Sequence, residues 1–104
     1  MRKYAETLVN YVGDKSFKHC GNHMVMKWPS IGYATYLDDK TDKWVTIDNA
    51  TRSFTYHGNV ICVVDDIAYK FWLSHAGWFT SSTSQALNQY RYYFESLGYK
   101  CMTD

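Results

Sequence analysis

Two histidines and a cysteine lie close together near the start of the chain, in the segment His19-Cys20-Gly21-Asn22-His23. Thiolate sulfur and imidazole nitrogen are preferred zinc ligands; a structural site needs four protein ligands, and a catalytic site needs three and a water. The missing ligands would have to come from distant residues, namely Cys101, His57 or His75. Because no second matching Cys–His pair follows, a polar loop with ordinary histidines is the alternative, and we expect no metal or other cofactor.

A thiol nucleophile is the second chemistry that the residue types allow. Cys20, with His57 or His75 as its base and one of the aspartates to orient that base, would supply the required groups. Spacing in the sequence does not show that these side chains meet. Cys62 lies in the most apolar segment of the chain, so we expect an inert core thiol. We therefore expect no catalytic residues and a protein that is not an enzyme.

Aspartates occur in two clusters. Asp65 and Asp66 are adjacent, and paired carboxylates perform acid–base chemistry when their surroundings separate their pKa values. They lie between two predicted strands, however, where aspartate is an ordinary turn residue. Asp38, Asp39 and Asp42 suggest a calcium loop, but the glycine and the terminal glutamate of such a loop are missing. We predict a turn at each place.

Aromatic rings alternate with basic side chains in two segments. One contains Tyr69, Lys70 and Trp72, and the other is Tyr-Arg-Tyr-Tyr at residues 90–93. Single-stranded nucleic acid binds such surfaces by stacking its bases on the rings, while Lys and Arg contact its phosphates. Protein interfaces use Tyr, Trp and Arg as anchors. We expect a partner-binding surface made of Tyr69, Lys70, Trp72, Trp78, Arg91 and Tyr92; in the nucleic-acid alternative, Tyr69, Lys70, Trp72 and Arg91 would make the contacts.

The composition limits the classes of function. The 104 residues fit one domain, residues 1–104, and include 11 Lys and Arg against 10 Asp and Glu. This balance argues against a strongly basic nucleic-acid binder and favours a protein partner. Ten tyrosines and four tryptophans exceed what a small core holds. Several rings should therefore be exposed, and a symmetric homodimer is one way to cover them.

The sequence also predicts a cellular setting. The N-terminus lacks the apolar run of a signal peptide, and no apolar stretch approaches the roughly 20 residues of a membrane span. Three cysteines make an odd number and show no disulfide framework. We expect a soluble cytoplasmic protein with reduced thiols and no membrane contact.

The first half of the chain predicts one short helix followed by strands. Residues 3–12 place apolar side chains at helical spacing, and Gly13 ends this helix. Residues 14–23 are polar and irregular. Strands are predicted at 24–28, 31–37, 44–47 and 52–56; they are separated by Pro29, by a polar turn at 38–43 and by a turn at Asp48-Asn49, and Gly58-Asn59 marks the next turn.

The second half predicts a hairpin and a capped helix. Residues 60–64 are apolar on both faces, which is typical of a central strand covered on both sides. Asp65-Asp66 then forms a tight turn, and residues 67–73 alternate as the returning strand. A helix with an apolar stripe follows as far as Leu97. Its signals are a capping box of Ser82 with Gln85, a left-handed C-cap at Gly98, and Tyr99 packing back on the last turn.

Five consecutive hydroxyl side chains at residues 80–84 precede this helix. They serve as caps or, in the alternative, as a phosphate-binding helix N-terminus. Together the elements predict an α+β fold. It consists of a curved antiparallel sheet of four to six strands in a meander, with the C-terminal helix packed on it and a short N-terminal helix.

Residues 52–94 resemble small accessory proteins of bacteriophages and mobile elements. The residues that carry the resemblance are Ser53-Phe54-Thr55-Tyr56, Val60-Ile61-Cys62-Val63, Ile67-Ala68-Tyr69 and Ser81-Ser82-Thr83-Ser84. The resemblance brings no catalytic residues. It implies a non-enzymatic protein that binds and occludes a host protein or ribonucleoprotein, such as a CRISPR-type defence nuclease.

Overall fold

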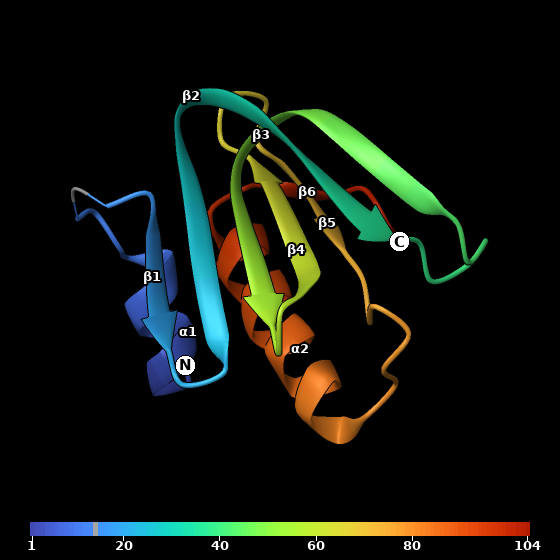
Figure 1. Cartoon of the computed structure of the whole chain (residues 1–104). Helices are drawn as coiled ribbons and strands as arrows, with labels where there is room; N and C mark the ends of the chain where they lie inside the picture. Colours follow the sequence, from blue (N-terminus) through green and yellow to red (C-terminus); the bar gives the residue numbers. More distant parts are fainter. Residues whose placement is uncertain (14) are drawn as a thin grey trace.

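Six strands form one sheet in a computed structural model that describes residues 1–13 and 15–104 (Figure 1). The strands lie in the sheet in their sequence order, from β1 to β6. This arrangement confirms the predicted α+β fold with a short N-terminal and a C-terminal helix. The elements are α1 (Lys3–Val9), β1 (Phe17–Cys20), β2 (His23–Leu37), β3 (Trp44–Tyr56), β4 (Asn59–Asp65), β5 (Lys70–Leu73), α2 (Ser81–Ser96) and β6 (Lys100–Cys101).

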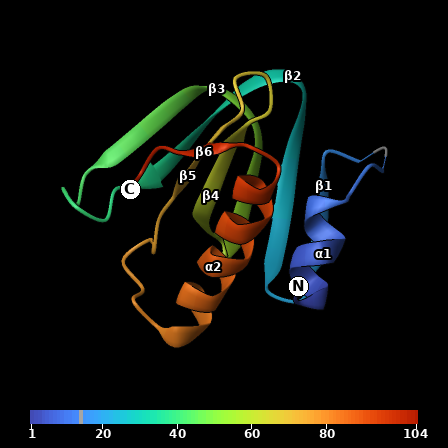
Figure 2. The same cartoon turned by 180° about the vertical axis from the view of Figure 1, so that it is seen from behind.

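The last strand departs from the predicted antiparallel meander. β6 pairs with β5 in parallel, with Lys70 opposite Lys100 and Phe71 opposite Cys101. Parallel neighbours need a long crossover, and α2 supplies it by running across one face of the sheet (Figure 2). Short turns join the first five strands, which confirms the predicted antiparallel meander for them, whereas no strand was predicted after the C-terminal helix.

β2 and β3 are longer than predicted, because each joins two predicted strands. Pro29 does not end β2, and Asp48-Asn49 is no turn but part of β3. The pairing of the two strands shifts register between Lys27 and Gly32. Proline donates no backbone hydrogen bond, and such irregularities bend a strand. The hairpin accordingly bends over the top of the sheet (Figure 1).

Two predictions at the N-terminal end were wrong. The first helix ends at Val9, where Asn10 donates its side-chain amide to the Glu6 carbonyl at 3.0 Å, and Val12 is exposed. The segment predicted as irregular contains β1. β1 is an edge strand with three of its four residues exposed, so it lacks the alternating burial that would have revealed it.

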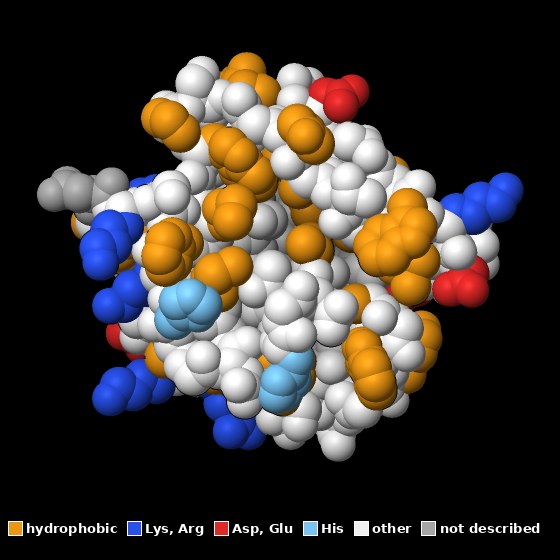
Figure 3. All heavy atoms as spheres, viewed as in Figure 1, with side chains coloured by type: hydrophobic (Ala, Val, Ile, Leu, Met, Phe, Trp, Pro, Cys, Tyr) orange, Lys and Arg blue, Asp and Glu red, His pale blue; other side chains and the backbone are white. Residues whose placement is uncertain are grey.

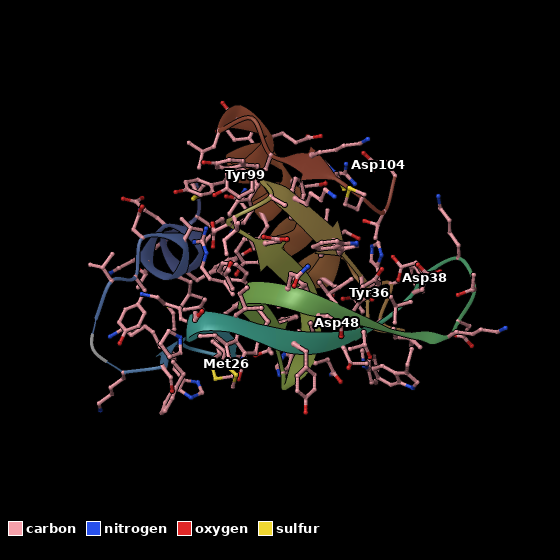
Figure 4. All side chains as sticks on the ribbon, turned by 90° about the horizontal axis from the view of Figure 1, so that it is seen from above. Met26, Tyr36, Asp38, Asp48, Tyr99 and Asp104 are labelled. Carbon is pink, nitrogen blue, oxygen red and sulfur yellow. The ribbon has the colours of Figure 1, made fainter. Side chains whose placement is uncertain are left out.

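Apolar side chains form a cluster on each face of the sheet. The larger cluster lies between α1, α2 and the sheet, and includes Ile61 and the fully buried Tyr90. The smaller one lies under the bent hairpin, where Tyr36 and Ala50 pack with Val63. Figure 4 shows Tyr36 on the side of the sheet away from Tyr99. β4 therefore contributes to both clusters, which confirms the central strand covered on both sides.

The ends of α2 combine one wrong and one correct prediction. Thr80, not Ser82, is the N-cap; its hydroxyl accepts a hydrogen bond from the Thr83 N–H at 3.3 Å. At the other end Gly98 has φ +89°, and its N–H donates to the Glu95 carbonyl at 3.0 Å. The Tyr99 N–H donates to the Phe94 carbonyl, also at 3.0 Å, which completes the predicted C-cap.

Two apolar positions in this half differ from the prediction. The strand expected from residue 67 begins only at Lys70, because residues 66–69 form the turn and leave Ile67 exposed. Leu97, expected in the buried stripe of the helix, lies beyond its last turn and is exposed as well.

Candidate functional site

The six residues expected to bind a partner do not form one surface. Tyr69 and Lys70 lie at the turn into β5, where the Tyr69 ring meets Tyr99 edge-on. Trp78 lies in the loop before α2, at the N-terminal end of that helix, whereas Tyr99 follows its C-terminal end. Trp72 packs against the smaller apolar cluster, on the other face of the sheet from α2. Arg91 and Tyr92 belong to α2; Tyr92 is exposed, and Arg91 pairs with Asp104 at 2.7 Å and with Glu95 at 4.0 Å.

Residues 19–23 form the end of β1, a tight turn and the start of β2, and not the predicted loop. Cys20 pairs with His23 across a two-residue turn. The His23 ring, however, stacks between Tyr4 at 3.8 Å and Tyr56 at 4.3 Å, and its buried Nδ1 has no hydrogen-bond partner. Burial lowers the pKa of His23, with His57 adding to the effect. Within residues 1–13 and 15–104, no three His, Cys, Asp or Glu side chains lie where they could hold a metal ion.

The two adjacent aspartates have different roles. Asp65 is the last residue of β4 and not part of the turn, but it stabilises the turn that follows: its carboxylate accepts the N–H groups of Ile67 and Ala68 at 3.0 and 2.9 Å. Asp66 reaches across the sheet to Arg52, with Nε–Oδ2 and Nη2–Oδ1 distances of 2.8 and 2.7 Å. Asp38 likewise caps its own turn by accepting the Thr41 N–H at 2.8 Å.

A groove opens beside the start of α2. Its volume is about 500 Å³, and Tyr56, Ala76 and Trp78 contribute to its apolar surface. His57 of the β3–β4 turn and Trp78 of the β5–α2 loop both line it. The two residues of that turn, His57 and Gly58, have φ angles of +51° and +80°. Trp78 is 60% exposed, and the adjacent Phe79 is 68% exposed. The lining residues are Tyr56, His57, Asn59, Ile61, His75, Ala76, Trp78, Thr80, Ser82 and Thr83.

The β5–α2 loop is held in place by the tip of the β2–β3 hairpin. Asp39 accepts the backbone N–H of His75 at 2.9 Å through Oδ1, and its Oδ2 lies 2.7 Å from His75 Nδ1. Phe79 stacks on the His75 ring at 4.5 Å. The Ser74 hydroxyl donates to the Leu37 carbonyl. The sequence pattern did not predict these contacts, because Asp39 and His75 lie 36 positions apart in the chain.

The N-terminal side of the molecule is basic. Residues 1–30 contain the bases Arg2, Lys3, Lys15, Lys18 and Lys27 against the acids Glu6 and Asp14, a balance of +3. Figure 3 shows the Lys and Arg side chains of this face mainly on the side where α1 and β1 lie. A shallow hollow of about 530 Å³ there is lined by Tyr11, Lys15, Phe17, Lys18 and His19.

No protein-family model, curated protein or solved structure matches the chain. Neither helix in the described part of the chain is long and apolar enough to cross a membrane.

Proposed function

We propose that this chain is a binding protein of phage type, whose occlusion of a surface of a host protein or ribonucleoprotein is non-enzymatic. The observation that carries the proposal is the groove beside α2, with Trp78 and Phe79 exposed next to it. Exposed rings on a rigid frame are typical of the anchors of protein interfaces. Trp78 is also the one residue of the expected binding set that lines this groove.

The chemistry of the groove favours a protein segment as its occupant. None of its ten lining residues is Lys, Arg, Asp or Glu. Apolar surface from Ala76 and Trp78 suits an apolar side chain of the partner. The exposed hydroxyl of Ser82 can pair with that partner's backbone. A volume of about 500 Å³ falls within the range of ligand pockets and holds one or two large side chains.

The class of partner follows from the resemblance of residues 52–94 to phage accessory proteins. Such proteins redirect or block host machinery, and a CRISPR-type nuclease complex is the host target that we propose. Occlusion requires a stable contact and no chemistry, and the exposed rings of Trp78 and Phe79 beside the groove can supply that contact.

An affinity pull-down of the tagged protein from host lysate, with and without nuclease, tests this function. We expect a stoichiometric protein partner in both arms. Recovery that disappears after nuclease treatment would contradict a protein partner and identify a nucleic-acid binder instead.

A second function, binding of single-stranded nucleic acid, is favoured by a different surface. Lys15, Lys18 and Phe17 combine positive charge with an exposed ring on the basic N-terminal side. The residues first considered for this role do not meet, because Trp72 and Arg91 lie on opposite faces of the sheet. This function predicts an affinity for oligonucleotides that falls steeply with salt and is weakened in Lys15→Ala/Lys18→Ala. Affinity that does not change with salt would exclude it.

A further inference from the structure

We propose that Ser84, His75 and Asp39 form a nucleophile, base and orienting acid that react with small activated carboxylic esters. The three side chains line one cleft of about 200 Å³, next to the groove. The cleft shares His75 with the groove. The occlusion proposed above uses Trp78 and needs no chemistry, so either proposal can fail without the other.

Asp39 fixes the proton of the His75 ring. Its Oδ2 lies 2.7 Å from Nδ1, and its Oδ1 accepts the backbone N–H of the same residue at 2.9 Å. Because a carboxylate only accepts, Nδ1 of the neutral ring carries the proton and Nε2 keeps its lone pair. The hydroxyl of Ser84 lies 3.3 Å from that Nε2. This is the order of contacts in which a histidine removes the proton of a serine.

The ring of His75 is held in this orientation from two sides. Phe79 stacks on it with an angle of 20° between the planes. The hairpin tip that carries Asp39 is tied to the same loop by the hydrogen bond from the Ser74 hydroxyl to the Leu37 carbonyl. The His75 side chain remains 24% exposed, so the cleft beside it is open to a substrate.

The surroundings of Ser84 suit an ester. Ser84 lies in the first turns of α2, a helix of 16 residues whose N-terminal end favours negative charge. Asn88 and Arg91 lie one and two turns further along the same face and line the cleft. Arg91 binds Asp104 through Nη1 and gives the cleft a positive charge. Leu73 and Leu87 complete the cleft with apolar surface for a short acyl chain.

The reaction balances without a further reagent. Ser84 Oγ gives its proton to His75 Nε2 and forms a bond to the carbonyl carbon of the ester. The bond from that carbon to the alcohol oxygen then breaks, and the alcohol leaves with the proton from His75. Water attacks the acyl-serine in the same way, which releases the carboxylic acid and restores the hydroxyl.

A fluorophosphonate probe tests the nucleophile. Ser84 Oγ bonds to phosphorus, fluoride leaves, and His75 takes the hydroxyl proton. We expect mass spectrometry of the digested protein to find the adduct on Ser84, with none on Ser81 or Ser82 of the same turn. Ser84→Ala should abolish labelling, whereas Ser81→Ala, which removes an exposed hydroxyl from the same helix, should label as the wild type does.

The base is tested by His75→Gln and Asp39→Asn, which should slow labelling at least tenfold. Thermal unfolding of each variant shows whether the fold persists. Wild-type protein unfolded in urea is the control for a serine that has no histidine beside it, and we expect no labelling of Ser84 in this control. Absence of an adduct on Ser84 in the folded wild type would overturn the proposal. Labelling of a folded His75→Gln at the wild-type rate would overturn it as well.

Discussion

At the scale of single residues, the ion pair of Arg52 and Asp66 joins parts of the chain that the sequence does not connect. Besides Arg52, the Asp66 carboxylate accepts the hydroxyls of Thr51 and Tyr99, each at 2.6 Å. Arg52 also donates to the Val9 carbonyl at 3.1 Å, at the end of α1. These contacts connect the first helix, the centre of the sheet and the segment after α2. The sequence predicted only that Asp66 lies in a turn.

Replacing Asp66 by Asn should destabilise the protein by about 2 kcal/mol at pH 7, because charged hydrogen bonds are lost from a half-buried site. Burial opposes ionisation of Asp66, but hydrogen bonds from Arg52, Thr51 and Tyr99 outweigh it, so its pKa lies below the ordinary value. The stabilisation is therefore complete above about pH 4 and is lost as the pH falls through the folded-state pKa.

Urea unfolding of this variant and of the wild type at pH 7 and pH 3 measures both effects. The exposed Asp48, for which the structure records no hydrogen bond, provides the control Asp48→Asn. A free energy of unfolding that is equal for Asp66→Asn and Asp48→Asn would contradict the role of the ion pair.

The thiols offer a second test at this scale. Burial raises the pKa of the Cys62 thiol strongly, and Cys101 is 8% exposed, whereas Cys20 is partly exposed. Because thiolates are the reactive species, we expect the folded protein to react with Ellman's reagent at Cys20 alone, and all three thiols to react in guanidinium. Cys20→Ser should remove the native reaction, and a rapid reaction that remained in it would show that the core thiols are accessible.

At the scale of the elements, the N-cap of α2 can be tested by comparing Thr80 with Ser82, two hydroxyl residues at the start of this helix. The structure places the N-cap at Thr80, whereas the capping-box pattern predicted Ser82. Thr80→Ala should cost about 1 kcal/mol of stability, because the Thr83 N–H loses its acceptor. Ser82→Ala should change stability by under about 0.5 kcal/mol. Thermal or urea unfolding compares the two, and a larger loss for Ser82→Ala would place the cap where the sequence suggested.

The bend of β2 gives another test. A side chain at Gly32 would collide with the indole of Trp28, so the glycine lets the strand pass close to this ring. Gly32→Ala should therefore displace Trp28 and destabilise the protein by about 1–3 kcal/mol, as overpacking does. Urea unfolding against Ser30→Ala, an exposed position in the same bend, measures this. Equal stability of the two variants would contradict the close packing.

Elements with a strong local pattern could be predicted, and those set by distant packing could not. β4 is apolar at almost every position, and α2 carries its own stripe and C-cap, so both follow from the sequence. β1 has no buried face to generate a pattern. The parallel pairing of β6 depends on the position of the C-terminal end of α2, from which the chain continues into β6. The continuity of β2 through Pro29 depends on the folding of the β2–β3 hairpin over the sheet.

At the scale of the whole molecule, the fold gathers functional groups that lie far apart in the chain. The groove takes residues from the β3–β4 turn, the β5–α2 loop and the start of α2. The sequence suggested Trp78 because of its type, but no spacing indicated that it would face His57. In the same way Asp39, His75 and Ser84 meet only because the hairpin tip reaches the loop before α2.

The affinity of the captured partner for matched aromatic variants tests the central claim most directly. Trp78→Ser/Phe79→Ser removes the rings beside the groove, whereas Tyr92→Ser removes an equally exposed ring from the outer surface of α2. We predict that the double variant, with wild-type stability, binds at least tenfold more weakly than the wild type, while Tyr92→Ser binds as the wild type does. Equal binding by the double variant and the wild type would contradict a binding role for the groove.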